Sequence, residues 1–329
     1  MKLDPGAFLP LVEALKSRAE LGLKRDIQLA AKSFARSQQS AWFPSKTPIL
    51  NGDDTAALPD PAGGFVLFAA EGMRGELIEA DPWFAGFSSL MVNINDVAAM
   101  GGRPWAVVDV LFLGGGDNAR VLEGMRAASE MFGVPVVGGH TTRVSGASML
   151  AVSVVGRASE LISSHAAKPG QNLVVAVDLR GSFRGAGGNF NAATTASPAQ
   201  LRSSLAVLPE LAEASLVRAG KDISMAGVCG SLLMLLETSG VGAELWLERL
   251  PAPPQVDPLR WLGAFPSFGF VLAVDDDALP SVLARFDRAG VASAAAGRIT
   301  STRRLELGYE GERALYWDLQ QTPLTGFGP

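Results

Sequence analysis

The sequence is poor in the residues that build several common sites. Its 329 residues include one cysteine and two histidines, which are Cys229, His140 and His165. A single cysteine excludes an internal disulfide and any zinc or iron–sulfur site made of cysteines, and two histidines exclude a three-histidine zinc site. Because a chain without disulfides suits a reducing compartment, we expect a cytoplasmic protein.

Charge and long apolar runs are also scarce. Charged residues make up 19% of the chain and the net charge is −5, so the basic face that nucleic acid or an anionic membrane requires is lacking and we expect neither partner. No apolar run reaches the roughly 18 residues of a spanning helix. The first residues lack the apolar stretch of a secretory signal. Apolar residues nevertheless make up 48% of the chain, enough for two hydrophobic cores.

Several well-known motifs are missing as well. The chain has no GxxxxGK[ST] loop, no GxGxxG after a strand, no GxSxG and no HExxH. These absences exclude a P-loop, a Rossmann dinucleotide site, a serine-hydrolase elbow and a zinc-protease helix.

Strand and helix patterns alternate along the chain, which predicts an α/β fold of layered sheets and helices. We predict one or two amphipathic helices over residues 8–36 and an ordered loop over 42–61. A connector near 159–170 divides the chain into domains 1–162 and 163–329. Further strands are predicted at 65–70, 105–113, 134–137, 148–155, 172–178, 243–247, 268–274 and 292–299, with a closing hairpin at 305–317. Further helices are predicted at 82–100, 117–132, 201–219, 223–239 and 278–289.

Acidic residues at predicted loops are candidate metal ligands. Asp53 and Asp54 are adjacent, and neighbouring carboxylates repel each other unless a cation or hydrogen-bond donors compensate them. Mg²⁺ prefers such oxygens, although an Asx-type turn also explains the pair. Glu71 follows the predicted strand 65–70, where α/β folds place ligands, although a solvated loop residue fits equally well.

Asp96 is the most informative acidic residue. It lies among apolar residues of the predicted helix 82–100, where an uncompensated charge costs several kcal/mol. Asn93 precedes it by three residues and lies on the same helix face. A structural hydrogen bond to a helix N-terminus is the alternative explanation. Asp222 is a further candidate ligand, although a helix N-cap explains it locally.

A glycine pair after the predicted strand 134–137 is a candidate phosphate contact. Gly138 and Gly139 would let phosphate approach backbone N–H groups, with His140 and Thr141 next to them. His140 could equally be a core histidine that one hydrogen bond satisfies. Arg143 is a candidate partner for phosphate, although most arginines are surface residues.

Six segments in this order resemble the superfamily of AIR synthase, thiamine-monophosphate kinase, selenophosphate synthetase and the hydrogenase-maturation carbamoyl dehydratase. The chain is most similar to the subgroup of AIR synthase-related proteins. The segments are residues 51–57 (NGDDTAA), 81–104, 134–142 (VPVVGGHTT), 168–171 (KPGQ), 222–224 (DIS) and 238–244 (TSGVGAE).

The resemblance implies two α/β domains and a homodimer in which strands of the N-terminal domains pair across subunits. It implies ATP in the cleft and Mg²⁺ between the phosphates and the aspartates. Carried over by position, the implied metal ligands are Asp53 or Asp54, Glu71, Asp96 and Asp222. The implied nucleotide contacts are Gly138 and Gly139, and we add Thr141 and Asn93.

Departures from the family pattern narrow the activity. The family usually has aspartate at the position of Glu71. Thiamine-monophosphate kinase has aspartates at the positions of His140 and Met225. We therefore expect phosphoryl transfer from ATP to an oxygen of a small metabolite, with His140 as proton carrier near the γ-phosphate and Asp96 as the second catalytic residue. Arg74 and Arg143, with the loop 181–198, would form the substrate pocket. Thiamine-monophosphate kinase activity and a non-catalytic nucleotide-binding relative are the alternatives.

Overall fold

The computed structural model describes residues 1–34, 41–42, 47–185 and 187–329, and their first half forms a curved five-stranded sheet. The strand order is β1-β2-β5-β3-β4, and neighbours are antiparallel except for the parallel pair β3 and β4. The strands are β1 (Ala56–Pro59), β2 (Phe65–Met73), β3 (Arg103–Gly115), β4 (Val136–Ala147) and β5 (Met149–Ala158).

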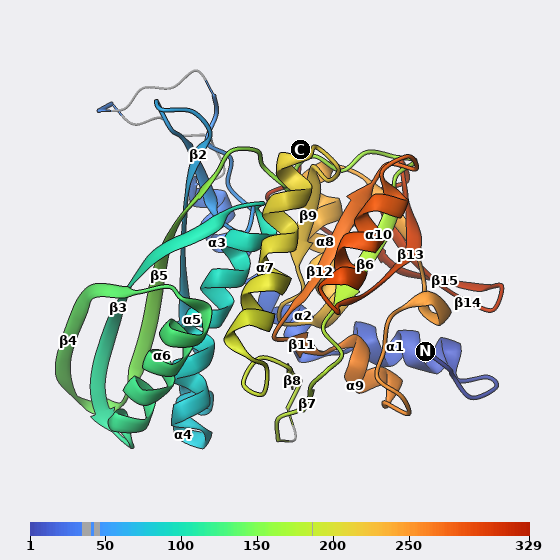
Figure 1. The fold of residues 1–329 in the computed structure, drawn as a ribbon. Coiled ribbons are helices and arrows are strands. Elements are labelled where there is room, and N and C mark those ends of the chain that lie inside the picture. The colour runs from blue at the N-terminus through green and yellow to red at the C-terminus, as the bar shows by residue number, and fades with distance from the viewer. Residues whose placement is uncertain (35–40, 43–46, 186) are drawn as a thin grey trace.

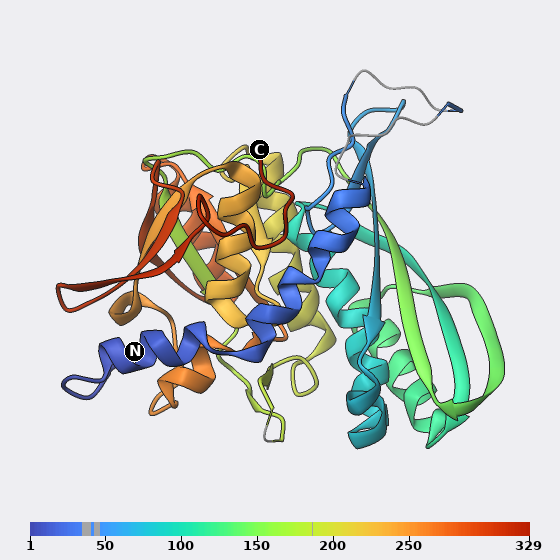
Figure 2. The same cartoon turned by 180° about the vertical axis from the view of Figure 1, so that it is seen from behind.

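Helices cover one face of this sheet (Figures 1 and 2). They are α4 (Gly75–Ala80), α5 (Pro82–Ala99) and α6 (Asn118–Phe132). Strand residues alternate between the two faces, so Val107 and Leu111 are buried under the helices while Val108 and Val110 are exposed on the other side. Among the described elements, none covers that open face (Figure 1).

A seven-stranded sheet dominates the second half of the chain. Its order is β15-β14-β10-β13-β6-β12-β9, and its neighbours are antiparallel except for β10 and β14. The strands are β6 (Asn172–Val177), β9 (Ala219–Asp222), β10 (Gly242–Trp246), β12 (Gly269–Val274), β13 (Ala292–Thr300), β14 (Arg304–Tyr309) and β15 (Glu312–Asp318). A small third sheet holds β7 (Ser182–Phe183), β8 (Asn189–Asn191) and β11 (Phe265–Pro266).

Both faces of the seven-stranded sheet are buried, each in its own core. Val174 and Ala176 of β6 face a core shared with α5 and the five-stranded sheet, and α7 (Pro198–Glu213) and α10 (Leu279–Arg288) complete it. Leu173 and Val175 face the opposite core under α8 (Gly227–Ser239). One apolar core therefore joins the two halves of the chain and fixes one sheet against the other.

The first two of the three N-terminal helices pack in the core under α8, and Gln28 of the third donates to the carbonyls of Pro323 and Leu324. The three helices are α1 (Phe8–Lys16), α2 (Ala19–Arg25) and α3 (Ile27–Phe34), and α1 buries Phe8, Val12 and Leu15 in the core under α8. Residues 35 and 36 of the predicted N-terminal helices lie outside the described residues, as do residues 43–46 of the predicted loop. The domain division at residue 162 stays a prediction, and α1 packs with the segment after that division.

The fold is a mixed α/β fold of two domains, as the sequence predicted. The start of α5 is confirmed, because the Asp81 carboxylate accepts a hydrogen bond from the N–H of Phe84 at 3.2 Å. Asp117 caps α6 in the same way, through the N–H of Arg120 at 3.1 Å. The final hairpin turns at Glu310 and Gly311, both with positive φ. Among the described helices, none combines the length and apolar character needed to cross a bilayer.

Several element ends differ from the prediction. Strand β2 continues past residue 70 and contains Glu71, and β4 continues past residue 137 and contains the glycine pair. The predicted helix 201–219 ends at residue 213, and residues 219–222 form β9 instead. Strand β1 lies within the predicted loop 42–61. The short helices α9 (Pro258–Leu262) and η1 (Leu247–Arg249) were not predicted.

Candidate functional site

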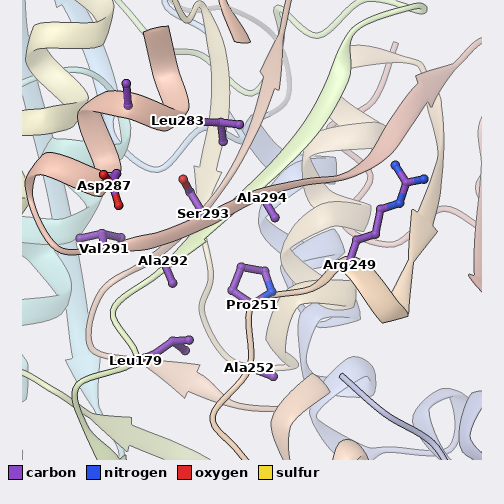
Figure 3. A pocket seen from close by; sticks show the side chains of 11 residues that line it. Leu179, Arg249, Pro251, Ala252, Leu283, Asp287, Val291, Ala292, Ser293 and Ala294 are labelled. Atoms are coloured by element: carbon purple, nitrogen blue, oxygen red, sulfur yellow. The ribbon is translucent and has the colours of Figure 1, made fainter. Parts of the chain in front are cut away.

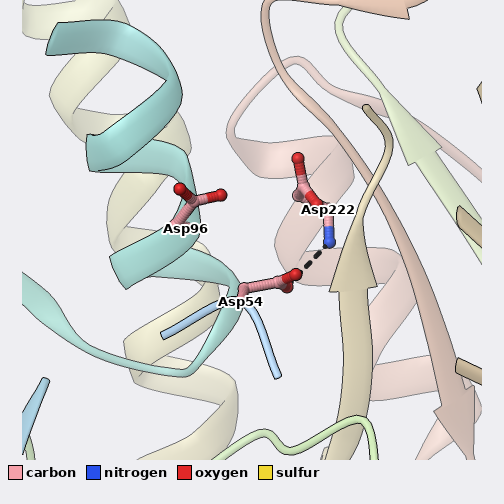
Figure 4. A group of neighbouring side chains, drawn as sticks. All are labelled: Asp54, Asp96 and Asp222. Atoms are coloured by element: carbon pink, nitrogen blue, oxygen red, sulfur yellow. Dashed lines mark hydrogen bonds between the residues drawn. The ribbon is translucent and has the colours of Figure 1, made fainter. Parts of the chain in front are cut away.

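Three aspartates from distant parts of the chain meet between the two sheets. Asp54 precedes β1, Asp96 lies in α5 and Asp222 is the last residue of β9. One carboxylate oxygen of each lies within 4.8 Å of an oxygen of the others (Figure 4). We call these three residues the carboxylate cluster. Packing of α5 against the edge strand β9 brings it together.

Asp96 is the least compensated member of the cluster. It is 7% exposed, and its Oδ2 has no hydrogen-bond partner in the described part of the chain. Burial, followed by the charges of Asp222 and Asp54, raises the pKa of Asp96 well above its ordinary value. Burial and Asp54 also raise the pKa of Asp222 to about 7. The ionised cluster therefore needs a cation, and carboxylate oxygens are the ligands that a hard divalent cation prefers.

Asp54 is already paired with a lysine. Its carboxylate forms an ion pair with the ammonium of Lys221, and both side chains are 3% exposed. It also accepts a hydrogen bond from the backbone N–H of Asp222 at 3.1 Å (Figure 4). Burial alone would lower the pKa of Lys221, but the charges of Asp54, Asp222 and Asp53 outweigh it and raise that pKa. The charge of one aspartate is thus balanced within the protein.

A second buried lysine was missed by the sequence reasoning. Lys24 of α2 is 7% exposed, and its Nζ donates to Ser224 Oγ at 3.1 Å and to Met234 Sδ at 3.1 Å. Burial lowers the pKa of Lys24 to about 8, although the charge of Asp222 opposes that shift. The local sequence gave no signal, since a lysine in a short amphipathic helix ordinarily lies in solvent.

Asp53 lies outside the carboxylate cluster. Its Oδ2 accepts a hydrogen bond from Ser163 Oγ at 2.5 Å, and its Oδ1 accepts one from the N–H of Ser164 at 2.7 Å. Both oxygens are therefore occupied by the connector that leads to the second sheet. Of the two adjacent aspartates, Asp54 faces the cluster and Asp53 anchors the loop.

Glu71 lies at the margin of the cluster. It is inside β2, two residues before the strand ends, so the expectation that it follows the strand was wrong. The strand is longer than its apolar run because β5 pairs with it as far as Met73. The side chain is exposed, and its charge contributes to the raised pKa values of Asp96 and Asp222.

The glycine pair and its neighbours lie away from the carboxylate cluster. Gly138, Gly139, His140, Thr141 and Arg143 all belong to β4, the edge strand of the five-stranded sheet. Pairing across β5 and β3 puts Glu71 and Gly139 in one row, three strand spacings apart. At about 4.8 Å per spacing, roughly 14 Å separates them.

The prediction of a phosphate-binding glycine loop was wrong in its local structure. The glycines lie in a regular strand, and Gly139 has a packing reason of its own, since a Cβ there would stand 2.4 Å from Asp109 Oδ1. His140 pairs with Val110 and shares its exposed face, with its ring 6.5 Å from that of Phe112. Within one chain, His140 and Asp96 therefore lie on opposite sides of the sheet.

Two remaining candidates lie near the cluster without joining it. Asn93 is fully buried one turn before Asp96, where its Nδ2 donates to the carbonyl of Ser89 at 2.8 Å and its Oδ1 has no partner among the described residues. Arg74 is exposed next to the start of α4 and forms an ion pair with Glu76 at 3.5 Å.

A separate hollow lies on the second sheet and is lined by other residues. It has a volume of about 560 Å³ and lies between α10, β13 and the segment after η1 (Figure 3). Its lining is mainly apolar, and the guanidinium of Arg249 stacks over the ring of Trp246 at 4.3 Å. It contains none of the predicted site residues, and we assign it no chemistry.

Comparison with known proteins agrees with this two-domain architecture. Residues 52–158 match the AIR synthase related protein N-terminal domain, and residues 141–310 match the C-terminal domain of the same family. The chain is 45% identical to an uncharacterized protein of Synechocystis sp. over 92% of this chain and 94% of that protein. The chain belongs to the AIR synthase related protein family.

The more distant relatives include PurL, and solved structures of PurL and ThiL resemble this chain. The chain is 25% identical to phosphoribosylformylglycinamidine synthase subunit PurL of Methanosarcina barkeri, over 85% of this chain and 43% of PurL. Thermotoga maritima PurL complexed with ADP has a similar structure, with a TM-score of 0.75 and 18% identity over 94% of this chain and 52% of that one. ThiL complexed with AMPPCP and TMP gives a TM-score of 0.65 at 18% identity, over 88% of this chain and 96% of ThiL. The structural likenesses show the fold alone, and the chain spans about half the length of PurL.

Proposed function

We propose that the protein is an enzyme that uses Mg²⁺ and ATP to phosphorylate an oxygen of a small metabolite. The observation that carries this proposal is the carboxylate cluster, in which Asp96 is buried beside Asp54 and Asp222 and has one oxygen without a hydrogen-bond partner among the described residues. Phosphoryl transfer is catalysed mainly by positioning and by neutralising charge, which metal-binding carboxylates make possible.

The residues present fit a divalent cation. Asp96 and Asp222 offer buried oxygens without an ion-pair partner in the described part of the chain. Asp54 offers Oδ2, which accepts a hydrogen bond from the N–H of Asp222, while Lys221 contacts Oδ1. Glu71, whose charge acts on Asp96 and Asp222, is proposed to contribute through a water molecule. When bound, Mg²⁺ would neutralise nucleotide phosphates at this point. Asp53 is proposed to orient Asp54 through the connector rather than to bind metal.

The nucleotide assignment is supported by similar proteins. Structures of PurL with ADP and with ATP, and of ThiL with AMPPCP, have the fold of this chain. We extend nucleotide binding to this protein because it combines that fold with the carboxylate cluster. Asn93 lies one helical turn from Asp96 and is proposed to contact the nucleotide.

A homodimer would explain both the open sheet face and the position of β4. Apolar side chains on or beside that face are exposed, among them Phe68, Val110 and Trp105, of which Trp105 is 63% exposed. A large exposed apolar surface marks an interaction site. We propose that a second copy covers it. Gly138, Gly139, His140, Thr141 and Arg143 of one copy would then contribute to the nucleotide and substrate site of the other, and Arg74 would face the substrate.

Two other functions are kept as candidates. ThiL was solved with TMP, so phosphorylation of thiamine monophosphate is one candidate, although the position of Met225 lacks the aspartate of that kinase. A non-catalytic nucleotide-binding protein is the other. It is favoured by Lys221, because this lysine already balances one charge of the cluster.

Thermal denaturation with ATP tests the main proposal. ATP with Mg²⁺ should raise the melting temperature more than ATP with EDTA, and the Asp96→Asn variant should lose this difference. Asp26→Asn, which changes an exposed aspartate at the end of α2, is the matched control. Equal stabilisation by ATP with and without Mg²⁺, together with no ADP release with any small-metabolite acceptor, would favour the non-catalytic reading.

A further inference from the structure

Two buried lysines face the carboxylate cluster, and their partners differ. Lys221 forms an ion pair with Asp54. Lys24 Nζ has two neutral partners, Ser224 Oγ and Met234 Sδ, each at 3.1 Å. Among the described residues, no carboxylate oxygen lies within 4.0 Å of the Lys24 ammonium. Lys24 is thus a buried cation whose contact partners carry no charge.

The contacts of Lys24 leave part of the hydrogen-bonding capacity of its ammonium unused. An ammonium donates three hydrogen bonds, a serine hydroxyl accepts one of them, and a thioether sulfur is a weak acceptor. A buried charge is costly unless it is paired and fully hydrogen-bonded. The side chain is nevertheless held in place, since Leu21 on the same helix face is buried and Gly230 of α8 leaves room for the lysine Cε.

The position of the ammonium suits an anion bound at the proposed metal site. Ser224, which accepts a hydrogen bond from the Lys24 ammonium at 3.1 Å, lies two residues after Asp222, so the lysine approaches the cluster from the side of α2. An anion bound to a metal at this cluster would therefore lie near the ammonium. Phosphoryl oxygens carry the charge and the acceptors that both cations require.

We propose that Lys24 binds the terminal phosphoryl group of the nucleotide. This inference rests on the proposed function, because it assumes that nucleotide phosphates reach the cluster. The contrary explanation is that Lys24 only neutralises the carboxylates and stabilises the fold. The two explanations predict different losses when Lys24 is removed. Loss of a lysine that only stabilises the fold would lower the melting temperature and weaken binding of the metal and of every nucleotide alike, whereas loss of a phosphate partner would weaken only nucleotides that carry the terminal phosphoryl group.

The test compares Lys24→Met with Lys32→Met, a matched control on the exposed side of α3. Calorimetry would measure binding of Mn²⁺ alone, of AMPPCP with Mg²⁺ and of ADP with Mg²⁺. For Lys24→Met we expect AMPPCP binding to weaken about 10- to 100-fold, as for loss of a hydrogen-bonded charge, and ADP binding to change less than about threefold. Mn²⁺ alone should bind equally or more tightly, and Lys32→Met should match the wild type throughout.

Conservative variants separate binding from folding. Lys24→Gln keeps a donor for Ser224 and should show the same selective loss of AMPPCP binding, while Lys24→Arg should recover part of it. Any one of three results would overturn the assignment: equal losses of AMPPCP and ADP affinity, no loss of affinity for either, or weaker Mn²⁺ binding together with a lower melting temperature. If the wild type itself does not bind AMPPCP with Mg²⁺, both the proposed function and the assignment of Lys24 fail.

Discussion

Replacing Asp96 by asparagine should stabilise the metal-free protein and weaken metal binding at once. The carboxylate lies within 4.8 Å of the carboxylates of Asp54 and Asp222, and its Oδ2 has no partner in the described part of the chain. At an effective dielectric constant of about 20, two charges at this distance repel by about 3 kcal/mol. Protonation relieves part of this repulsion, so we expect a gain of roughly 1–3 kcal/mol at pH 7.5.

The assay is thermal denaturation in EDTA and in Mn²⁺, combined with calorimetric titration of Mn²⁺. Asp96→Asn should melt a few degrees above the wild type in EDTA, since a stability change of this size shifts the melting temperature by that much. Mn²⁺ should stabilise the wild type strongly and the variant little, with affinity reduced at least about tenfold. A variant that melts below the wild type in EDTA and binds Mn²⁺ normally would refute the reasoning and give Asp96 a purely structural role.

Three further predictions concern pH, the C-terminal segment and assembly. The folded-state pKa of Asp222 is raised from 3.8 to about 7, so between these values the folded state keeps a proton that the unfolded state loses; the free energy of unfolding of the metal-free protein should therefore fall by on the order of 4 kcal/mol as the pH rises from 4 to 7. Urea unfolding in EDTA should show this decrease, and saturating Mg²⁺ should remove it. Equal stability at both pH values would contradict the prediction. Glu237 accepts four hydrogen bonds from residues 324–326. Glu237→Ala should therefore lower the free energy of unfolding by about 3 kcal/mol in thermal or urea denaturation. An unchanged value would show that the segment does not stabilise the fold. Val110→Asp on the open face should convert a dimer to a monomer in light scattering, whereas a monomeric wild type would refute the proposed dimer.

The elements with clear local signals were predicted well. Helices α5 and α6 begin where an aspartate cap and apolar periodicity indicated, and the final hairpin turns at Glu310 and Gly311. Strand ends were predicted poorly, because the pairing partner sets them. Strand β4 continues through its glycines because β3 pairs with it, and β2 continues through Glu71 because β5 does.

The candidate site was predicted in part. Asp54, Asp96 and Asp222 meet as expected, but the sequence could not separate Asp54 from Asp53. That choice depends on Ser163 and Ser164, 110 and 111 residues further along the chain.

Lys24 was missed for the same physical reason. Its burial depends on α8 and on Ser224, which lies 200 residues away in the sequence. A pattern confined to α2 contains no information about these partners. The placement of His140 on an exposed edge strand likewise follows from sheet order, which a single sequence does not specify.

Anomalous diffraction from crystals grown with Mn²⁺ and AMPPCP would test the central claim most directly. The account predicts an Mn²⁺ peak bound by carboxylate oxygens of Asp96 and Asp222, with Asp54 beside it, at metal–oxygen distances of about 2.1 Å. Nucleotide phosphate should lie on the other side of that peak. Nucleotide density without a metal peak between these aspartates, or a peak at another place in the molecule, would contradict it.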